Sequence, residues 1–215
     1  MTEAQHNRAI ARAAKAVLEP MGCIRKGTSR TWLDDHGWWV GVIEFQPSKW
    51  SKGSYLNVGA CWLWTTKDYF SFDDGYRIED FKEFKNDEQF QQAAQNLAER
   101  AKSEVAALRE RFHSVKATAQ YLATKQSRPD DIWAQYHAGV SAGLIGDVST
   151  ARARLQTVTT MQEREVDWVL ELKKKAANLL TTVEDRSLFR GAVEANIEKA
   201  RKLLKLPQRS EPIEL

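Results

Sequence analysis

The chain has 215 residues, of which 42% are hydrophobic and 28% charged, and its formal net charge is +3. This composition is ordinary for a globular protein, and the length allows one large domain or two small ones. No apolar run approaches the roughly 20 residues of a membrane-spanning helix, and the first residues are polar and lack a signal-peptide core. Basic residues form no block, which disfavours a dedicated nucleic-acid-binding protein. We therefore expect a cytoplasmic protein.

The first expected element is a helix at residues 2–19, because apolar residues recur there every three or four positions. Thr2 followed by Gln5 has the spacing of a capping box. Pro20 and Gly22 then end the helix.

Beyond that point the period of the apolar residues changes to two. We expect strands at 24–33, 38–46 and 54–65, and a short fourth strand or loop around 69–76 that ends at a turn at 73–75. Connections this short predict an antiparallel meander.

Six of the eight tryptophans lie in this strand region, between residues 32 and 64. A buried tryptophan removes about 150–250 Å² from water, which stabilises a fold by up to about 4–6 kcal/mol. Most of them must therefore be core, and the alternation favours Trp39, Trp62 and Trp64. Trp50 differs, because it lies in a polar loop beside lysines. It is either a contact residue or a plug folded onto the core.

The helical period returns at residue 86, and no glycine or proline occurs between residues 87 and 128. One helix over that stretch would be about 60 Å long, whereas a compact globule of this size is about 45 Å across. We expect a break near His113 and Ser114, because Ser114 can cap a new helix. Further helices are predicted at 131–145, 147–160, 163–183 and 187–206.

The sequence therefore predicts an α+β fold. An N-terminal helix packs on a three- to four-stranded antiparallel sheet within residues 1–85. A helical bundle follows at 86–206, and 207–215 is expected to be a flexible tail.

Three segments of the first half carry a family resemblance. They are residues 18–27 (LEPMGCIRKG), 42–48 (VIEFQPS) and 55–59 (YLNVG). As an ordered set they resemble the bacterial domain-of-unknown-function family numbered 4304, over residues 10–80. Cys23 departs from the aromatic residue usual in that family. The resemblance implies a helix against a small antiparallel sheet and implies no reaction.

Residues 133–158 resemble one tetratricopeptide helix pair, through small residues at that repeat's spacing and a Gly146-Asp147 turn. Repeat arrays need about three copies, so an ordinary helical hairpin is the alternative.

Catalytic and metal motifs are missing from the sequence. The four histidines show no i, i+4 pair, and no phosphate loop, dinucleotide fingerprint or nucleophile elbow occurs. Cys23 and Cys61 lie in strand-like sequence and are expected to be buried, reduced thiols. We therefore expect a non-enzymatic protein without a cofactor or a metal.

Candidate binding residues gather around the strand ends: Arg25, Lys26, Gln46, Ser48, Trp50 and Asn57. For Gln46 and Asn57, hydrogen bonding that supports the end of the sheet is the favoured alternative. The favoured function is a protein-binding module with a protein partner, such as a toxin-neutralising immunity protein or an adaptor. Two alternatives remain. One is a ligand- or carbohydrate-binding module with a tryptophan-lined sheet face, and the other is a weak nucleic-acid binder that stacks bases on Trp50.

Overall fold

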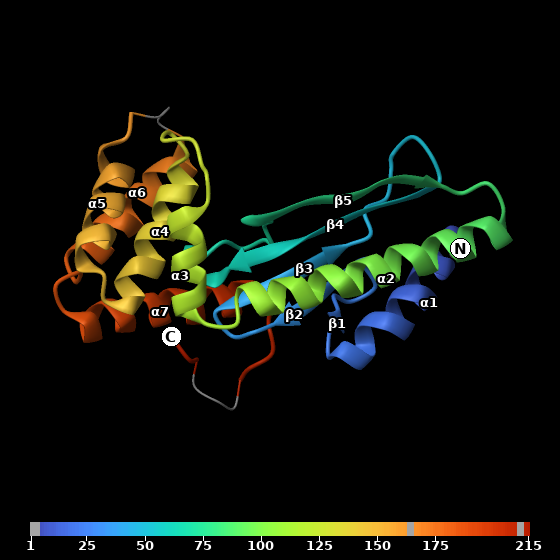
Figure 1. The fold of residues 1–215 in the computed structure, drawn as a ribbon, viewed down its shortest axis with the longest axis horizontal. Helices are drawn as coiled ribbons and strands as arrows, with labels where there is room; N and C mark the ends of the chain where they lie inside the picture. The colour runs from blue at the N-terminus through green and yellow to red at the C-terminus, as the bar shows by residue number, and fades with distance from the viewer. Residues whose placement is uncertain (1–4, 163–165, 210–212) are drawn as a thin grey trace. The chain divides into compact units, whose positions relative to one another are not determined.

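A computed structural model describes residues 5–162, 166–209 and 213–215 (Figure 1). The polypeptide forms two compact units. Unit 1 holds the residues up to Trp62 and Phe70–Glu110, and unit 2 holds Leu63–Tyr69 and the residues from Arg111 onward. The backbone therefore passes between the units three times. Our predicted boundary after residue 85 differs from this division.

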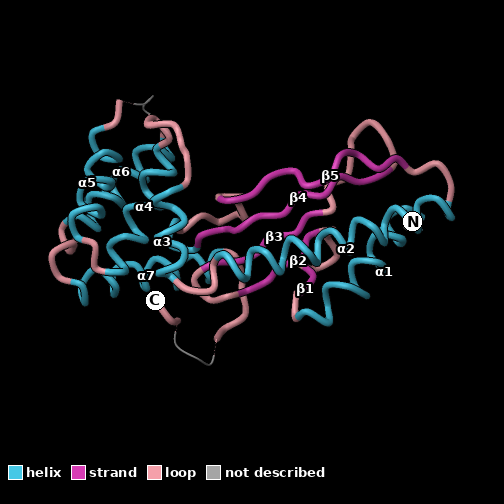
Figure 2. Tube along the Cα trace, viewed as in Figure 1, coloured by secondary structure: helices cyan, strands magenta, loops and turns pink. Residues whose placement is uncertain are grey.

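Unit 1 is a helix pair on a five-stranded antiparallel meander, with strand order β1-β2-β3-β4-β5. Its elements are α1 (Gln5–Leu18), the 3-10 turn η1 (Glu19–Met21), β1 (Ile24–Arg25), β2 (Thr31–Asp35), β3 (Trp39–Glu44), β4 (Gly53–Trp62), β5 (Asp74–Glu83) and α2 (Asp87–Arg111). Figure 2 shows the five strands side by side, with α1 and α2 running along the same side of them. The fold class is therefore α+β, as predicted, with one or two strands more than expected.

The helix-covered face of the sheet carries much of the core of unit 1. Trp32 pairs with Ile43 and Ile43 with Val58, and all three are buried. Trp39 pairs with Trp62 on the same face, and both indoles are buried. The prediction that Trp39, Trp62 and Trp64 are core residues is confirmed.

Three predicted strand bounds are wrong. Residues 24–33 form a hairpin of β1 and β2 instead of one strand, because Gly27 adopts a left-handed φ of 55° in the turn between them. The third predicted strand ends at Trp62, and Leu63–Thr65 form a 3-10 turn. The fourth strand begins at Asp74 rather than before it.

Unit 2 is a helical bundle that also includes one segment from the middle of the sequence. Its elements are η2 (Leu63–Thr65), α3 (Val115–Thr124), α4 (Ile132–Ile145), α5 (Val148–Thr160), α6 (Asp167–Leu180) and α7 (Arg186–Leu203). The four helices expected after residue 130 are thus present. The predicted starts at Thr2 and residue 163 lie outside the described residues, as does part of the predicted tail.

The expected break in the long helix is confirmed. α2 ends at Arg111, and Ser114 begins α3 in an extended conformation. Its side-chain oxygen accepts a hydrogen bond from the Ala117 amide at 3.1 Å. A serine at this position satisfies a backbone donor that the new helix would otherwise leave unpaired.

Close packing of α4 depends on two glycines. A Cβ on Gly139 would lie 2.9 Å from Leu155 Cγ of α5, and one on Gly143 would lie 2.3 Å from Phe189 Cζ of α7. Gly146 ends α4 with φ of 85°, and the carboxylate of Asp147 caps α5. The helical hairpin predicted from these small residues is therefore present.

No helix within the described residues combines the length and the apolar character needed to cross a membrane.

Candidate functional site

An open polar row crosses the sheet on the face opposite the helices. Glu44 pairs with Asn57 across β3 and β4, and Asn57 pairs with Arg77 across β4 and β5. Cross-strand partners point to the same side of a sheet, so these side chains form one line. Glu44 and Asn57 are half-buried, and Arg77 is exposed. The row lies next to Gln46, where the loop between β3 and β4 begins.

Hydrogen bonds join this row into a network. The Asn57 amide nitrogen donates to Glu44 Oε2 at 2.9 Å and to Gln46 Oε1 at 3.0 Å. Arg77 Nη2 donates to the same Gln46 oxygen at 3.0 Å, and Arg77 Nε lies 3.4 Å from Asn57 Oδ1. The structure therefore brings the predicted residues Gln46 and Asn57 together, each in contact with a guanidinium.

An aromatic pair supports Arg77 from one side. Its guanidinium carbon lies 3.9 Å from the centroid of the Tyr55 ring. Tyr55 in turn packs against Phe81, with ring centroids 5.0 Å apart. Stacking on an aromatic face suits arginine, because its guanidinium is planar and weakly hydrated.

The other predicted binding residues have separate positions. Lys26 extends the polar row, since its backbone amide donates to Thr31 O and Thr31 pairs with Glu44. The Lys26 ammonium lies 4.7 Å from the centroid of the Phe70 ring. Arg25 closes the turn after β1 by donating to Ser29 O at 2.7 Å.

Ser48 builds the loop that presents Trp50. Its hydroxyl accepts from the Trp50 amide at 3.1 Å and from the Ser51 amide at 3.4 Å. Trp50 is 93% exposed, whereas the other five tryptophans between residues 32 and 64 are at most 5% exposed. The plug interpretation of Trp50 is therefore wrong, and the side chain is available for contact.

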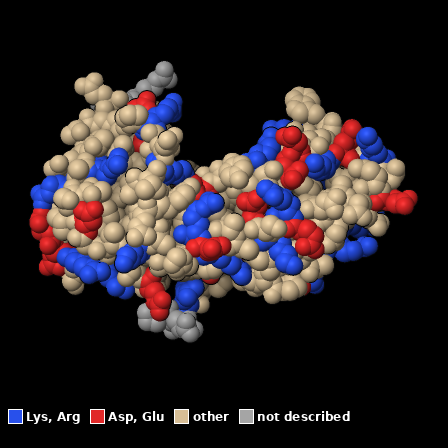
Figure 3. Space-filling view, viewed as in Figure 1, with Lys and Arg blue, Asp and Glu red and all other residues tan. Residues whose placement is uncertain are grey.

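A tryptophan-lined sheet face, which the carbohydrate alternative requires, is not open. The rings of Trp32, Trp38, Trp39 and Trp62 are buried. Both signs of charge are interspersed over the face shown in Figure 3, without a continuous basic stripe.

A cluster of titratable groups surrounds Asp34, on the helix-covered face. Arg109 of α2 donates to both Asp34 oxygens, at 2.7 and 2.9 Å, and to Met21 O at 2.7 Å. His36 Nε2 lies 2.7 Å from Asp34 Oδ2, and its ring stacks on Trp39. Burial by itself raises the pKa of Asp34, but the hydrogen bonds from Arg109 and His36 outweigh it and hold that pKa below its usual value. Through the Arg109–Asp34 hydrogen bonds, the cluster attaches α2 to β2 of the sheet.

Cys23 lacks the environment of a nucleophile. Cys23 and Cys61 are buried, as predicted, and neither forms a disulfide among the described residues. Burial, followed by the nearby Asp34 carboxylate, raises the pKa of Cys23 to about 12. A thiol with this pKa is protonated at neutral pH and is a poor nucleophile. Within the described residues no group of three or more His, Cys, Asp or Glu side chains could hold a metal ion.

In unit 2 an aromatic cluster attaches the inserted segment to the helices. Trp64 Nε1 donates to His137 Nδ1 at 3.0 Å, and Trp133 stacks on both His137 and Trp168. Lys67 Nζ lies 3.9 Å from the centroid of the Trp133 ring. These contacts join Leu63–Tyr69 to α4 and α6, which is a structural role.

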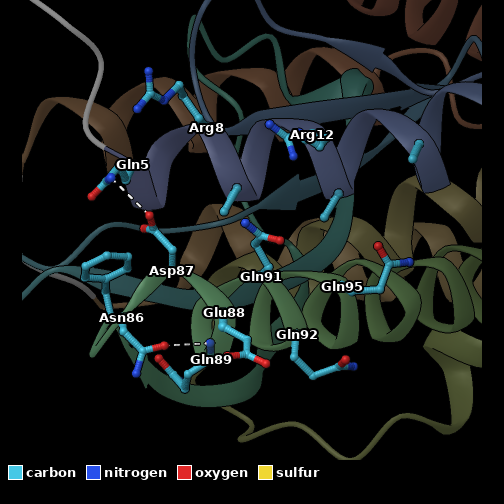
Figure 4. Close-up of a pocket in the computed structure, with 14 residues that line it drawn as sticks. Gln5, Arg8, Arg12, Asn86, Asp87, Glu88, Gln89, Gln91, Gln92 and Gln95 are labelled. Atoms are coloured by element: carbon cyan, nitrogen blue, oxygen red, sulfur yellow. Dashed lines mark hydrogen bonds between the residues drawn. The ribbon is translucent and has the colours of Figure 1, made fainter.

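A polar groove of about 1070 Å³ separates α1 from α2 (Figure 4). Gln5 Nε2 donates to Asp87 Oδ2 at 3.0 Å and bridges the two helices at one end, and Gln91 lies between the helices. Ala9 and Ala13 belong to the α1 side of the groove. Glutamine amides both donate and accept hydrogen bonds, and Arg8, Arg12, Asp87 and Glu88 add charge of both signs, so the groove offers polar and charged contacts.

Arg77, Tyr55 and Glu44 were missed as site residues. No local motif marks Arg77, and its place in the row depends on the register between β4 and β5. Alternation along the predicted strands was the available signal, since it places Tyr55 on the same face as Asn57 and Glu44 on the same face as Gln46.

Comparison of the protein with protein-family models, curated proteins and solved structures finds no match. The resemblance to the family numbered 4304 stays a prediction.

Proposed function

We propose that the protein is a non-enzymatic protein-binding module, acting as an adaptor or as a toxin-neutralising partner. Its contact surface consists of the loop at residues 47–52 and the adjacent polar row. The observation that carries this proposal is the exposure of Trp50 beside five buried tryptophans.

The energetic argument starts from the size of the indole. Leaving Trp50 in water forgoes up to about 4–6 kcal/mol of hydrophobic stabilisation that a partner's pocket would recover. Tryptophan is among the residues most enriched at the energetic centres of protein interfaces. The Ser48 hydrogen bonds hold the loop in one turn, which lowers the entropy lost on binding.

Loop and row are continuous on the surface of unit 1. Gln46 belongs to the network, and its carbonyl accepts from the Tyr55 amide at 2.9 Å, so this hydrogen bond joins the two ends of the loop. A partner that covers both the loop and the row would contact Trp50, Arg77 and the amides beside it.

A capture experiment with matched variants tests the proposal. The wild-type protein, Trp50→Ala and Trp168→Ala are immobilised and exposed to nuclease-treated extract of the source organism. Trp168 is the control, because it is an exposed tryptophan of unit 2. We expect a stoichiometric protein to be retained by wild type and Trp168→Ala, and retention by Trp50→Ala to fall at least about tenfold.

Equal retention by Trp50→Ala, or no stoichiometric protein under several salt conditions, would refute the proposal. A partner that disappears on nuclease treatment would point to nucleic acid instead.

A further inference from the structure

We propose that Arg77 is a receptor for a carboxylate group on the protein partner. The surface beside Trp50 would then recognise an acidic side chain or a C-terminal carboxylate. This inference rests on the proposed protein-binding function and adds the chemistry of the group that is recognised.

The guanidinium is held in one orientation before any partner arrives. Tyr55 supports its face at 3.9 Å, and Gln46 and Asn57 accept its hydrogen bonds on one edge. Asn57 is itself fixed by Glu44. An exposed ion pair is usually weak, partly because two long side chains must be ordered to form it. Here the cost of ordering the arginine is already met within the fold.

The outer edge of Arg77 remains available. A guanidinium has five N–H donors. Nε and one N–H of Nη2 point to the amide oxygens of Asn57 and Gln46. The remaining Nη1 and Nη2 donors make no hydrogen bond to the described residues. Two parallel N–H groups at that spacing match the two oxygens of a carboxylate.

No carboxylate of the described residues neutralises this charge. Arg77 forms no ion pair among them, although acidic residues lie nearby on β3 and β5. Glu79 pairs with Lys82 at 3.0 Å, and Glu44 accepts the Asn57 amide. The amides that touch Arg77 orient it without cancelling its charge.

The surroundings favour a carboxylate over a phosphate. β5 carries four acidic residues (Asp74, Glu79, Asp80, Glu83) against two basic ones (Arg77, Lys82). The rest of the row adds Glu44 and Lys26, one of each sign, and the two lysines of the contact loop, Lys49 and Lys52, lie on the Trp50 side. A doubly charged phosphate or a nucleic-acid backbone is repelled more strongly by this field than a single carboxylate is.

An NMR titration with small anions tests the proposal without a protein partner. The ¹⁵N-labelled full-length protein is titrated at constant ionic strength with sodium acetate, with inorganic phosphate and with chloride. The reporters are the Arg77 Nε–H signal and the Asn57 side-chain amide. Three variants are compared: Arg77→Gln, Arg77→Lys, and Arg8→Gln as a control for an exposed arginine that forms no ion pair with the described residues.

We expect acetate to move both wild-type signals in proportion to its concentration and more than chloride does. The Asn57 response should fall at least about tenfold in Arg77→Gln. Arg77→Lys should also lose most of it, because lysine lacks the planar pair of donors. Arg8→Gln should respond as wild type does.

A flat acetate titration, a response unchanged in Arg77→Gln, or a larger response to phosphate than to acetate would each overturn the proposal. Because the titration uses no protein partner, its failure is distinct from failure of the capture experiment.

Discussion

Single residues fix how α2 is attached to the sheet. Arg109 reaches a carboxylate that is almost fully buried, and it does so with two parallel donors. A buried charge that loses its partner is costly, because it is left desolvated and unpaired. The Asp34–Arg109 pair is therefore a position where one change has a large effect on stability.

We predict that Arg109→Met lowers the free energy of unfolding by about 2 kcal/mol. This loss is smaller than that for a fully buried ion pair, because the Arg109 side chain is 34% exposed. Arg100→Met is the control, since Arg100 pairs with Glu104 on the solvent side of the same helix. The control should change stability by less than about 1 kcal/mol. Urea unfolding followed by tryptophan fluorescence measures both, and equal effects would contradict the prediction.

The Asp34–Arg109 pair should also make the stability of the fold depend on pH. The folded-state pKa of Asp34 is depressed by its hydrogen bonds, so its contribution to stability is present above the unfolded pKa of about 3.9 and is lost as the pH falls below that. The stability difference between wild type and Asp34→Asn should therefore be constant near neutral pH and shrink below about pH 4. A difference that grows on acidification would exclude this account.

At the scale of elements, local chemistry determines where helices start and how closely they pack. Ser114→Ala should cost about 1 kcal/mol, because it removes the acceptor for the Ala117 amide. Ser103→Ala on the exposed side of α2 should change stability by less than about half of that. Thermal unfolding by circular dichroism compares them, and a larger loss from Ser103→Ala would contradict the capping argument.

Two glycines of unit 2 form a second matched pair. Gly143→Ala would place a methyl group 2.3 Å from the Phe189 ring, whereas the corresponding position at Gly191 has no atom within 4 Å. We expect Gly143→Ala to destabilise by about 1–3 kcal/mol. Gly191→Ala should stabilise by about 0.5–1 kcal/mol, since alanine favours the helix. Chemical denaturation measures the change in the free energy of unfolding for each variant. Changes of the same sign in both variants would refute the packing argument.

Element prediction succeeded where a repeat of apolar residues was long and failed where a glycine had two interpretations. The α2–α3 break followed from the length of the repeat and a capping serine. Gly75 indicated a turn in the sequence, but it lies within β5, where it pairs with Gly59 of β4. A glycine is needed there because a Cβ on Gly75 would lie 2.4 Å from Gly59 Cα. Only the pairing of β4 with β5 shows this close approach. Arg77 was missed as a site residue for the same reason, since the register that places it beside Asn57 is not written in local sequence.

The whole molecule is two units that share one interleaved polypeptide. A fragment starting at Arg111 lacks Leu63 and Trp64, which are fully buried in unit 2. Losing the burial of Trp64 alone removes up to about 4–6 kcal/mol. We predict that residues 111–215 alone unfold at a lower temperature than unit 2 does in the full-length protein. Fusing residues 63–69 through a flexible linker should restore part of the loss, and calorimetry tests both fragments.

The inserted segment also affects synthesis. Trp64 leaves the ribosome 73 residues before His137, the group that its indole nitrogen contacts. At ordinary translation speeds this delay lasts roughly 4–15 s. During that interval strands β1 to β4 have been synthesised, but the helices against which Leu63 and Trp64 pack have not. These apolar side chains therefore stay exposed on the nascent polypeptide. Chaperone demand should therefore peak midway through translation and fall once α4 emerges.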